Sequence, residues 1–241
     1  MVYLKIIRPI NLGMLLLLQV IIRFGFFEPL ALPLAMNVFQ FCLLLLATLT
    51  IAAAGNVIND IYDTTIDAVN KPNRVIVGNY ISEKNAYTFY IILTSLGVCA
   101  GFLLANQLGK PGLAAVFIII AAILYMYASY LSALLLIGNI IVSALVAFAL
   151  ITVILFDIYP MLNANIAGYQ IPLRIVLVYA AFAFYFNLLR EIVKDIEDVN
   201  GDKKGERNTL AIALGRERTR NITFDLGVFA LVAILWITYS Y

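Results

Sequence analysis

Two acid-rich stretches carry the residues of this chain that could do chemistry. In the first, Asn59, Asp63 and Asp67 follow one another at intervals of four, with Asp60 beside them. On a helix, residues at this spacing lie on one face, where like charges repel and where carboxylates beside hydrocarbon are costly unless something pairs with them. A helix that accepts both costs is expected to hold a cation. The alternative is a solvated helix end that leaves the membrane.

The second stretch repeats this pattern near the other end of the chain. Glu191, Asp195, Asp198 and Asp202 are spaced i, i+4, i+7 and i+11, which is one helical face if the helix continues that far. The Asn200-Gly201 pair is a signal that can end the helix earlier. On its own this stretch also fits a solvated cytoplasmic loop. Its acids are surrounded by basic residues, namely Arg190, Lys194, Lys203, Lys204 and Arg207.

Taken together, the two stretches predict a site for a metal-bound polyphosphate. The chain has no histidine, so metal or acid–base chemistry must use carboxylates or other groups, and hard oxygen ligands favour magnesium, calcium or manganese. Carboxylates would hold the metal ions, the ions would bridge phosphate oxygens, and the basic groups would take the remaining charge. Beside a hydrocarbon-lined helix bundle, such a site would suit a lipid diphosphate at the membrane surface.

The elements that must position these residues are membrane-spanning helices. The chain is 63% hydrophobic and only 12% charged, which is not the composition of a soluble globular domain, and a bilayer takes about 20 residues of helix. We therefore expect an all-α fold, a polytopic transmembrane helix bundle that forms a single domain over residues 1–241. About seven spans are visible, at 4–27, 36–58, 86–106, 111–130, 133–156, 173–190 and 221–241, with a polar loop at 157–172.

The positive charges set the expected orientation. With the N-terminus inside, only Arg23, Lys110 and Arg174 of the 16 Lys and Arg residues fall on the outer face, as the positive-inside rule requires. Both acid-rich stretches then lie on the cytoplasmic face of the cell membrane, where they can meet. The two cysteines, Cys42 and Cys99, sit in apolar runs and are expected to be buried thiols rather than a disulfide or a metal site. No nucleic acid partner is expected.

At this point the residues resemble those of the UbiA superfamily of intramembrane prenyltransferases. The family's first signature, N-D-x-x-D-x-x-x-D, is matched at Asn59, Asp60, Asp63 and Asp67, and a downstream N-x-P-x-R segment at Asn70, Pro72 and Arg74. The second signature, K-D-x-x-D-x-x-G-D, is matched at Lys194, Asp195, Asp198, Gly201 and Asp202. Arg8-Pro9 with Asn11, Gly138-Asn139, and the series Gly205, Thr209 and Gly215 continue the likeness along the chain.

The resemblance implies a fold and an activity. The family usually has nine transmembrane helices, so seven are expected of a short homologue or of a fragment that is incomplete at its C-terminal side. The wording of the second motif is most like the branch that makes archaeal-type ether lipids, the geranylgeranylglycerol-phosphate geranylgeranyltransferases. Two departures are Val75, where the family usually has proline, and Ser132, where many members carry a basic residue. The serine puts one phosphate or substrate contact in doubt.

In the family's scheme, two Mg²⁺ ions bind the diphosphate of an allylic prenyl donor. Transferred to this chain, the scheme makes Asn59, Asp63, Asp67, Asp198 and Asp202 metal or diphosphate ligands. Asp60, Glu191 and Asp195 would be ligands, groups that support them, or a base for the acceptor, and Arg74, Lys194 and Arg190 phosphate contacts. The expected partners are membrane lipid, a polyprenyl diphosphate, and a lipid-like or aromatic acceptor.

Two other functions stay open at this point. An aromatic acceptor of the quinone pathways would use the same site, with attack through a ring carbon in place of a hydroxyl. A cation-coupled transporter would also place acids in a membrane protein, but it predicts charges near mid-span, broken helices and internal symmetry. The acids of this chain lie instead at the ends of the spans, and no repeat is seen.

Overall fold

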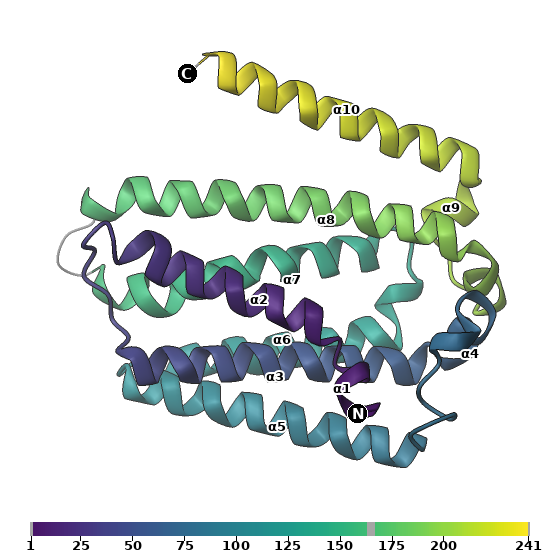
Figure 1. Ribbon diagram of the computed structural model, residues 1–241, viewed down its shortest axis with the longest axis horizontal. Coiled ribbons are helices and arrows are strands. Elements are labelled where there is room, and N and C mark those ends of the chain that lie inside the picture. The colour runs from purple at the N-terminus through teal and green to yellow at the C-terminus, as the bar shows by residue number, and fades with distance from the viewer. Residues whose placement is uncertain (1, 163–166, 241) are drawn as a thin grey trace.

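The computed structural model describes residues 2–162 and 167–240. Within those ranges the chain is helical and contains no β-strand, only one isolated bridge between Val77 and Ile81. Seven helical segments are long and apolar enough to cross a membrane, which confirms the all-α fold and the number of spans. They form an elongated bundle with both acid-rich stretches at one end, on the right in Figure 1.

The first half of the bundle is built around α3. A short helix α1 (Val2–Ile6) precedes α2 (Pro9–Val20), which continues into a π-helical segment η1 (Ile21–Phe27). Helix α3 (Val38–Tyr62) begins at a capping box, in which the side chains of Asn37 and Gln40 each accept a hydrogen bond from the other's backbone nitrogen at 2.9 Å. It packs on α5 (Glu83–Gln107) and α6 (Ala114–Ser129).

Close packing of α5 depends on small residues. A Cβ atom on Gly97 would lie 2.6 Å from Ile51 Cγ1 on α3, and Gly101 faces the ring of Phe117 on α6. Glycines four residues apart lie on one helix face and let neighbouring helices approach closely, as is common inside membranes.

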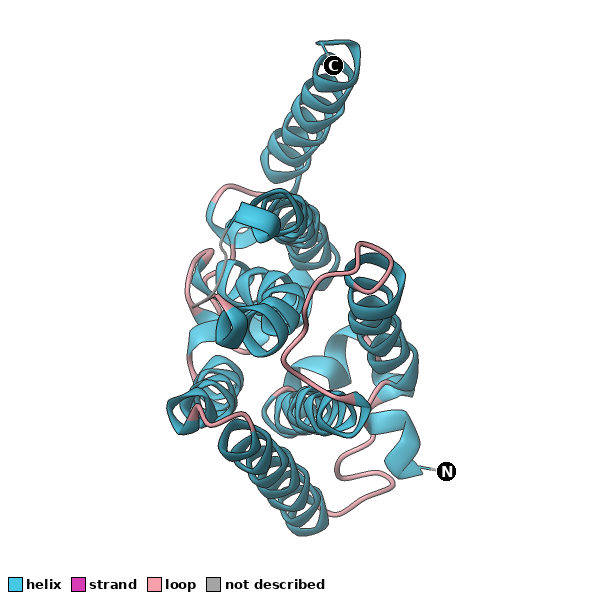
Figure 2. Ribbon diagram, turned by 90° about the vertical axis from the view of Figure 1, so that its left-hand side faces the viewer, coloured by secondary structure: helices cyan, strands magenta, loops and turns pink. Residues whose placement is uncertain are grey.

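The second half pairs α7 with a long α8. Helix α7 (Ile137–Val153) runs into a π-helical segment η5 (Ile154–Ile158), and α8 spans Gln170–Lys204, a length of 35 residues. A short α9 (Leu210–Ala213) leads to α10 (Arg216–Ser240), which packs on α8 and α9 and is the outermost helix of the bundle (Figures 1 and 2).

Several expected boundaries differ from the observed ones. The first span starts at Pro9 rather than residue 4, because Arg8 has a left-handed backbone (φ 55°) that separates α1 from α2. Helix α8 does not stop at Asn200-Gly201 but continues to Lys204. The expected loop 157–172 contains helical turns at Tyr159–Met161 and Ala167–Tyr169, while residues 163–166 lie outside the described part. The last span is Arg216–Trp236, within a helix that continues to Ser240. Tyr241 also lies outside the described part.

The cysteine prediction was half right. Cys42 and Cys99 are free thiols, as expected, but both are exposed rather than buried. They lie on helices whose apolar outer faces remain uncovered within the described chain. The outer face of a membrane bundle is apolar because it contacts lipid, and not because it packs in a protein core. Apolar neighbours in the sequence therefore did not indicate burial.

The end of the bundle away from the acid-rich stretches holds a buried ion pair. Arg23 on η1 pairs through Nη1 with Asp157 on η5, and the two residues are 3% and 0% exposed. Arg23 Nη2 also donates to the carbonyl oxygen of Met36 at 2.5 Å, while Asp157 accepts from the Met36 nitrogen at 3.0 Å. One turn along α2, the buried Gln19 donates to Thr152 Oγ1 at 3.0 Å. These polar contacts tie α2 and η1 to α7 and η5 inside the apolar core.

Candidate active site

The site forms where α4 (Thr64–Asn70) packs against the C-terminal end of α8. The side chain of Asn70 donates to the carbonyl oxygen of Asp198 at 2.9 Å and accepts from the nitrogen of Gly201 at 2.8 Å. Lys71 Nζ pairs with Asp198 Oδ2 at 2.7 Å. The two acid-rich stretches, which are separated by more than a hundred residues in sequence, are thereby held side by side.

The first stretch is bent rather than continuous. Helix α3 ends at Tyr62 and α4 begins at Thr64. The expectation of one helix through Asn59, Asp63 and Asp67 is therefore wrong, because the helix is interrupted at Asp63, which has φ −88° and ψ 1°. The backbone hydrogen bonds from Asp63 to Asn59 and from Asp67 to Asp63 are nevertheless kept, each at 2.8 Å. The bend turns α4 toward α8 while the spacing of the acids is preserved.

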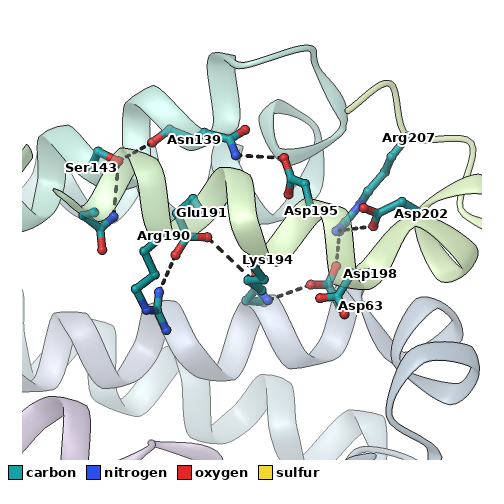
Figure 3. A network of polar contacts seen from close by, with 12 residues as sticks. Asp63, Asn139, Ser143, Arg190, Glu191, Lys194, Asp195, Asp198, Asp202 and Arg207 are labelled. Atoms are coloured by element: carbon teal, nitrogen blue, oxygen red, sulfur yellow. Dashed lines mark hydrogen bonds and ion pairs between the residues drawn. The ribbon is translucent and has the colours of Figure 1, made fainter. Parts of the chain in front are cut away.

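Arg207 connects the two stretches through their carboxylates. It lies in the segment between α8 and α9, where Nη2 contacts Asp63 Oδ1 and Nη1 lies 3.6 Å from Asp202 Oδ1 (Figure 3). Asn59 Nδ2 donates to the other oxygen of Asp63 at 2.7 Å. Asp63 and Asp202 are 7% and 2% exposed. A single guanidinium thus bridges one buried acid from each motif.

The remaining acids have different partners. Asp60 pairs with Arg8 at 2.6 Å. Glu191 pairs with Arg190 at 2.5 Å and, more loosely, with Lys194 at 3.7 Å. Asp60 of the first stretch and Glu191 of the second are thus each paired with a basic side chain.

Asp195 is held by a neutral group instead. Asn139 Nδ2 on α7 donates to Asp195 Oδ2 at 2.8 Å (Figure 3). Behind it, Asn187 Nδ2 donates to Ser143 Oγ at 3.2 Å, and Ser143 donates to the carbonyl oxygen of Asn139 at 2.6 Å. Among the described residues no Lys or Arg forms an ion pair with Asp195, so its Oδ1 is the oxygen left for a proton or a ligand.

These side chains enclose a small pocket of about 30 Å³, which is room for about one water molecule. Its walls come from α6, η4 (Leu131–Ala133), α7, α8 and the segment after α8. The departure noted at Ser132 therefore falls in the wall of the site itself. The lining residues are Tyr127, Ser132, Gly138, Asn139, Glu191, Lys194, Asp195, Asp198, Asp202, Arg207 and Thr209.

Most of the predicted site residues meet here, but not all of them. Asp63 reaches the site through Arg207, and Asn59 through Asp63. Asp60 is turned to Arg8. Arg74 is exposed in the short helix η2 (Pro72–Arg74), and among the described residues its side chain forms no ion pair with the site. The five that line the pocket are Glu191, Lys194, Asp195, Asp198 and Asp202.

Asp67 lies on α4, outside the membrane-spanning segments. Burial, and after it the nearby Asp63 carboxylate, raise the pKa of Asp67 above the usual value of an aspartate. A carboxyl group placed in this way gains from a cation.

Sequence reasoning missed the cations that pair with the motif aspartates. The motifs give no site role to Lys71 or Arg8, and they give Arg207 only the general role of a basic group near phosphate. Each is next to or inside a motif, which was the available signal, but its acidic partner is 52 to 144 residues away. Only the tertiary fold decides such pairs.

The donor set fits a hard divalent cation. Carboxylate and amide oxygens are the ligands that Mg²⁺ prefers, and the acids of both motifs face one another. In the arrangement observed, Arg and Lys side chains take the positions between the acids, and no three acidic or cysteine side chains of the described chain surround a common point. The metal ligands therefore stay a prediction from the sequence.

Comparisons with known proteins agree with this arrangement. The sequence profile described as the UbiA prenyltransferase family matches residues 26–241. Proteins named digeranylgeranylglyceryl phosphate synthase are similar: that of Methanoregula boonei is 33% identical over 196 residues (81% of this chain, 64% of the relative), and that of Sulfolobus acidocaldarius is 37% identical over 181 residues (74% and 59%). The chain thus spans less than two thirds of the length of these relatives.

A longer match and a solved structure extend the likeness. The digeranylgeranylglyceryl phosphate synthase of Thermococcus sibiricus is 30% identical over 237 residues, which cover 97% of this chain and 75% of the relative. A solved structure from work on digeranylgeranylglyceryl phosphate synthase in membranes is similar with a TM-score of 0.57 and 27% identity, over 96% of this chain and 74% of that one.

Proposed function

The chain belongs to the UbiA prenyltransferase family, and from that membership we propose that it transfers a prenyl group from its diphosphate to a lipid-like acceptor. The donor is proposed to be geranylgeranyl diphosphate and the acceptor geranylgeranylglycerol phosphate, the chemistry named by the relatives. The observation that carries the proposal is the meeting of both aspartate motifs at one pocket, through Arg207 between Asp63 and Asp202.

Mg²⁺ is the proposed cofactor. Asp63, Asp67, Asp198 and Asp202, with Asn59, would hold it. When bound, it supplies positive charge that stabilises the leaving diphosphate. Support comes from the donor set, since carboxylate and amide oxygens are the ligands that Mg²⁺ prefers.

The chain's own residues would do the rest of the work. Arg207, Lys71 and Lys194 lie at the acids and would take charge from the phosphate oxygens. As the C–O bond of the allylic donor breaks, an allylic cation forms, and the acceptor's hydroxyl oxygen attacks it. Asp195 would accept the hydroxyl proton at Oδ1, because Oδ2 is already bonded to Asn139.

The membrane placement follows the charges. We propose that the chain lies in the cell membrane with the pocket facing the cytoplasm. Support comes from the position of most Lys and Arg residues at the pocket's end of the spans.

The test is diphosphate release from geranylgeranyl diphosphate in nanodiscs, with and without Mg²⁺, over a panel of acceptors. The protein should release diphosphate with geranylgeranylglycerol phosphate as the acceptor. It should not do so with a hydroxybenzoate or a dihydroxynaphthoate. Asp63→Asn and Asp202→Asn should each lower the rate by about 100-fold or more. Glu197→Gln, which removes an exposed acid from the same helix α8, is the matched control and should leave the rate unchanged.

The variant Asp195→Asn distinguishes the role of a general base from that of a metal ligand. Loss of a general base slows transfer by about 10²- to 10⁴-fold, while binding of inorganic diphosphate with Mg²⁺ should stay at the parent's level. Parent rates in both Asp63→Asn and Asp202→Asn would overturn the proposed function.

A further inference from the structure

Thr209 is a buried residue of the pocket that no part of the reaction scheme uses. It follows α8 in the chain, directly before α9, and is 5% exposed. Its side chain lines the same pocket as Lys194 and Arg207. It was noted in the sequence only as part of a continuing pattern.

The hydroxyl group of Thr209 has no hydrogen-bond partner among the described residues. Thr209 occupies the N-cap position of α9, where a threonine ordinarily accepts a hydrogen bond from the backbone of the first turn. Here the side chain makes no such bond, although the backbone oxygen accepts from Ile212 and Ala213, each at 3.0 Å. Buried hydroxyl groups are nearly always bonded, so the one at Thr209 is free for a ligand.

The neighbouring threonines show the ordinary case. Thr219 and Thr223 are 0% and 8% exposed. Thr219 Oγ1 donates to the carbonyl oxygen of Gly215 at 2.9 Å, and Thr223 Oγ1 donates to that of Thr219 at 2.8 Å. Their hydroxyls are satisfied inside the protein, in contrast to that of Thr209.

The other groups in the pocket indicate what the ligand is. Lys194 Nζ lies 3.7 Å from its nearest acid, beyond hydrogen-bonding distance, so its donors are also available. Arg207 adds a guanidinium on the same wall. An ammonium, a guanidinium and a hydroxyl are all donors, and together they suit an oxygen that only accepts and carries negative charge, as a phosphate oxygen does. The pocket has room for about one such atom.

We propose that Thr209 is a substrate-contact residue whose hydroxyl donates a hydrogen bond to a phosphate oxygen, beside Lys194 and Arg207. The inference rests on the proposed function, which supplies two sources of this chemistry: the diphosphate of the prenyl donor and the phosphate of the acceptor. Four acids line the pocket. Asp198, Asp202 and Glu191 each have a cation as partner, and Asp195 is bonded to Asn139 through Oδ2.

The experiment compares variants that differ in one hydroxyl group. Thr209→Val removes it with nearly the same shape, Thr209→Ala removes it with less volume, and Thr209→Ser keeps it. Thr223→Val is the matched control, because it deletes a buried hydroxyl that bonds only to its own helix. Binding of inorganic diphosphate and of glycerol phosphate, each with Mg²⁺, is measured by calorimetry on the full chain in nanodiscs.

The expected result is a loss of about tenfold or more in affinity for one probe in Thr209→Val and Thr209→Ala, the size of a hydrogen bond to a charged group. Thr209→Ser and Thr223→Val should bind as the parent does. A loss for diphosphate assigns the hydroxyl to the donor, and a loss for glycerol phosphate assigns it to the acceptor. If Thr209→Val does not fold, Thr209→Ala gives the same comparison.

Parent affinity for both probes in every folded hydroxyl deletion would overturn the inference, and so would an equal loss in Thr209→Ser. The proposed function fails in a different way, through a parent protein that transfers no prenyl group to any acceptor. Because the probes are bound without turnover, the two failures are distinguishable.

Discussion

Gly201 of α8 lies so close to Asn70 of α4 that no side chain fits between them. A Cβ atom at Gly201 would lie 2.6 Å from Asn70 Cγ and 2.7 Å from the carbonyl oxygen of Ile66. The amide of Asn70 fills this space with its hydrogen bonds to Asp198 and Gly201. Position 201 of the second motif therefore requires a glycine because α4 packs against it, and not because the backbone makes a turn there.

Gly201→Ala should separate α4 from α8. Forcing a methyl group into a packed contact costs about 1–3 kcal/mol, and here it also breaks the bonds of Asn70, so we expect lower thermal stability and weaker diphosphate binding. Gly227→Ala is the control, because a Cβ atom there meets nothing within 4 Å, and alanine in a helix interior is up to about 1 kcal/mol better than glycine. Equal thermal midpoints in the two variants would contradict the packing argument.

Arg207→Gln should make the protein depend on metal for its stability. Removing the guanidinium leaves Asp63 and Asp202 buried without it, and breaking a buried ion pair costs about 3–5 kcal/mol. Mg²⁺ would replace the lost charge, so the rise in unfolding temperature on adding Mg²⁺ should be larger in the variant than in the parent. Arg216→Gln, at an exposed position of α10, should respond as the parent does. A rise no larger than the parent's would contradict the prediction.

Asn139→Ala should weaken the action of Asp195 without removing its carboxylate. The 2.8 Å hydrogen bond that holds Asp195 Oδ2 is lost, so we expect slower transfer at an unchanged affinity for diphosphate. Since both residues act through one proton acceptor, the double variant with Asp195→Asn should be little slower than Asp195→Asn alone. Asn221→Ala, exposed on α10, serves as the control. Additive losses would show that Asn139 acts elsewhere.

Single substitutions of Arg23 and Asp157 should be far more damaging than the double one. Arg23→Met or Asp157→Leu alone leaves an uncompensated buried charge, at a cost of about 3–5 kcal/mol, whereas apolar replacement of both partners is often close to neutral. Denaturant titration of the three variants in detergent measures the difference. Diphosphate binding should be retained in the double variant, because the pair lies at the opposite end of the bundle from the pocket. Equal losses in all three would contradict this account.

The spans were predictable from the sequence because a helix that crosses hydrocarbon must be long and apolar, and long apolar runs are visible in the sequence. The ends of the spans were not. Asn200-Gly201 has the residues of a helix stop, yet the helix continues because Gly201 is packed against Asn70. The bend at Asp63 is likewise set by the docking of α4 on α8. Both outcomes depend on contacts between residues far apart in the chain.

The candidate site was predictable in its acids and less so in its cations. Carboxylates at helical spacing can be recognised in the sequence, because like charges on one helix face repel and so indicate a bound cation. A basic residue beside them is ordinary at a membrane surface. Nothing in the sequence therefore distinguished Lys71, which pairs with Asp198, from Arg74, which is exposed. Thr209 was hidden for a related reason, since an unsatisfied hydroxyl can be recognised only in three dimensions.

The buried pair of Arg23 and Asp157 has a consequence for the synthesis of the protein. Its members are 134 residues apart in sequence, and ribosomes add about 5–20 residues per second. The first span therefore waits roughly 7–27 s, at that rate, before its acidic partner is made. During this interval the arginine must keep its charge in contact with water or headgroups at the membrane surface. Insertion of the fifth span would then allow the two π-helical segments to pair, so that this end of the bundle closes only after Asp157 has been made.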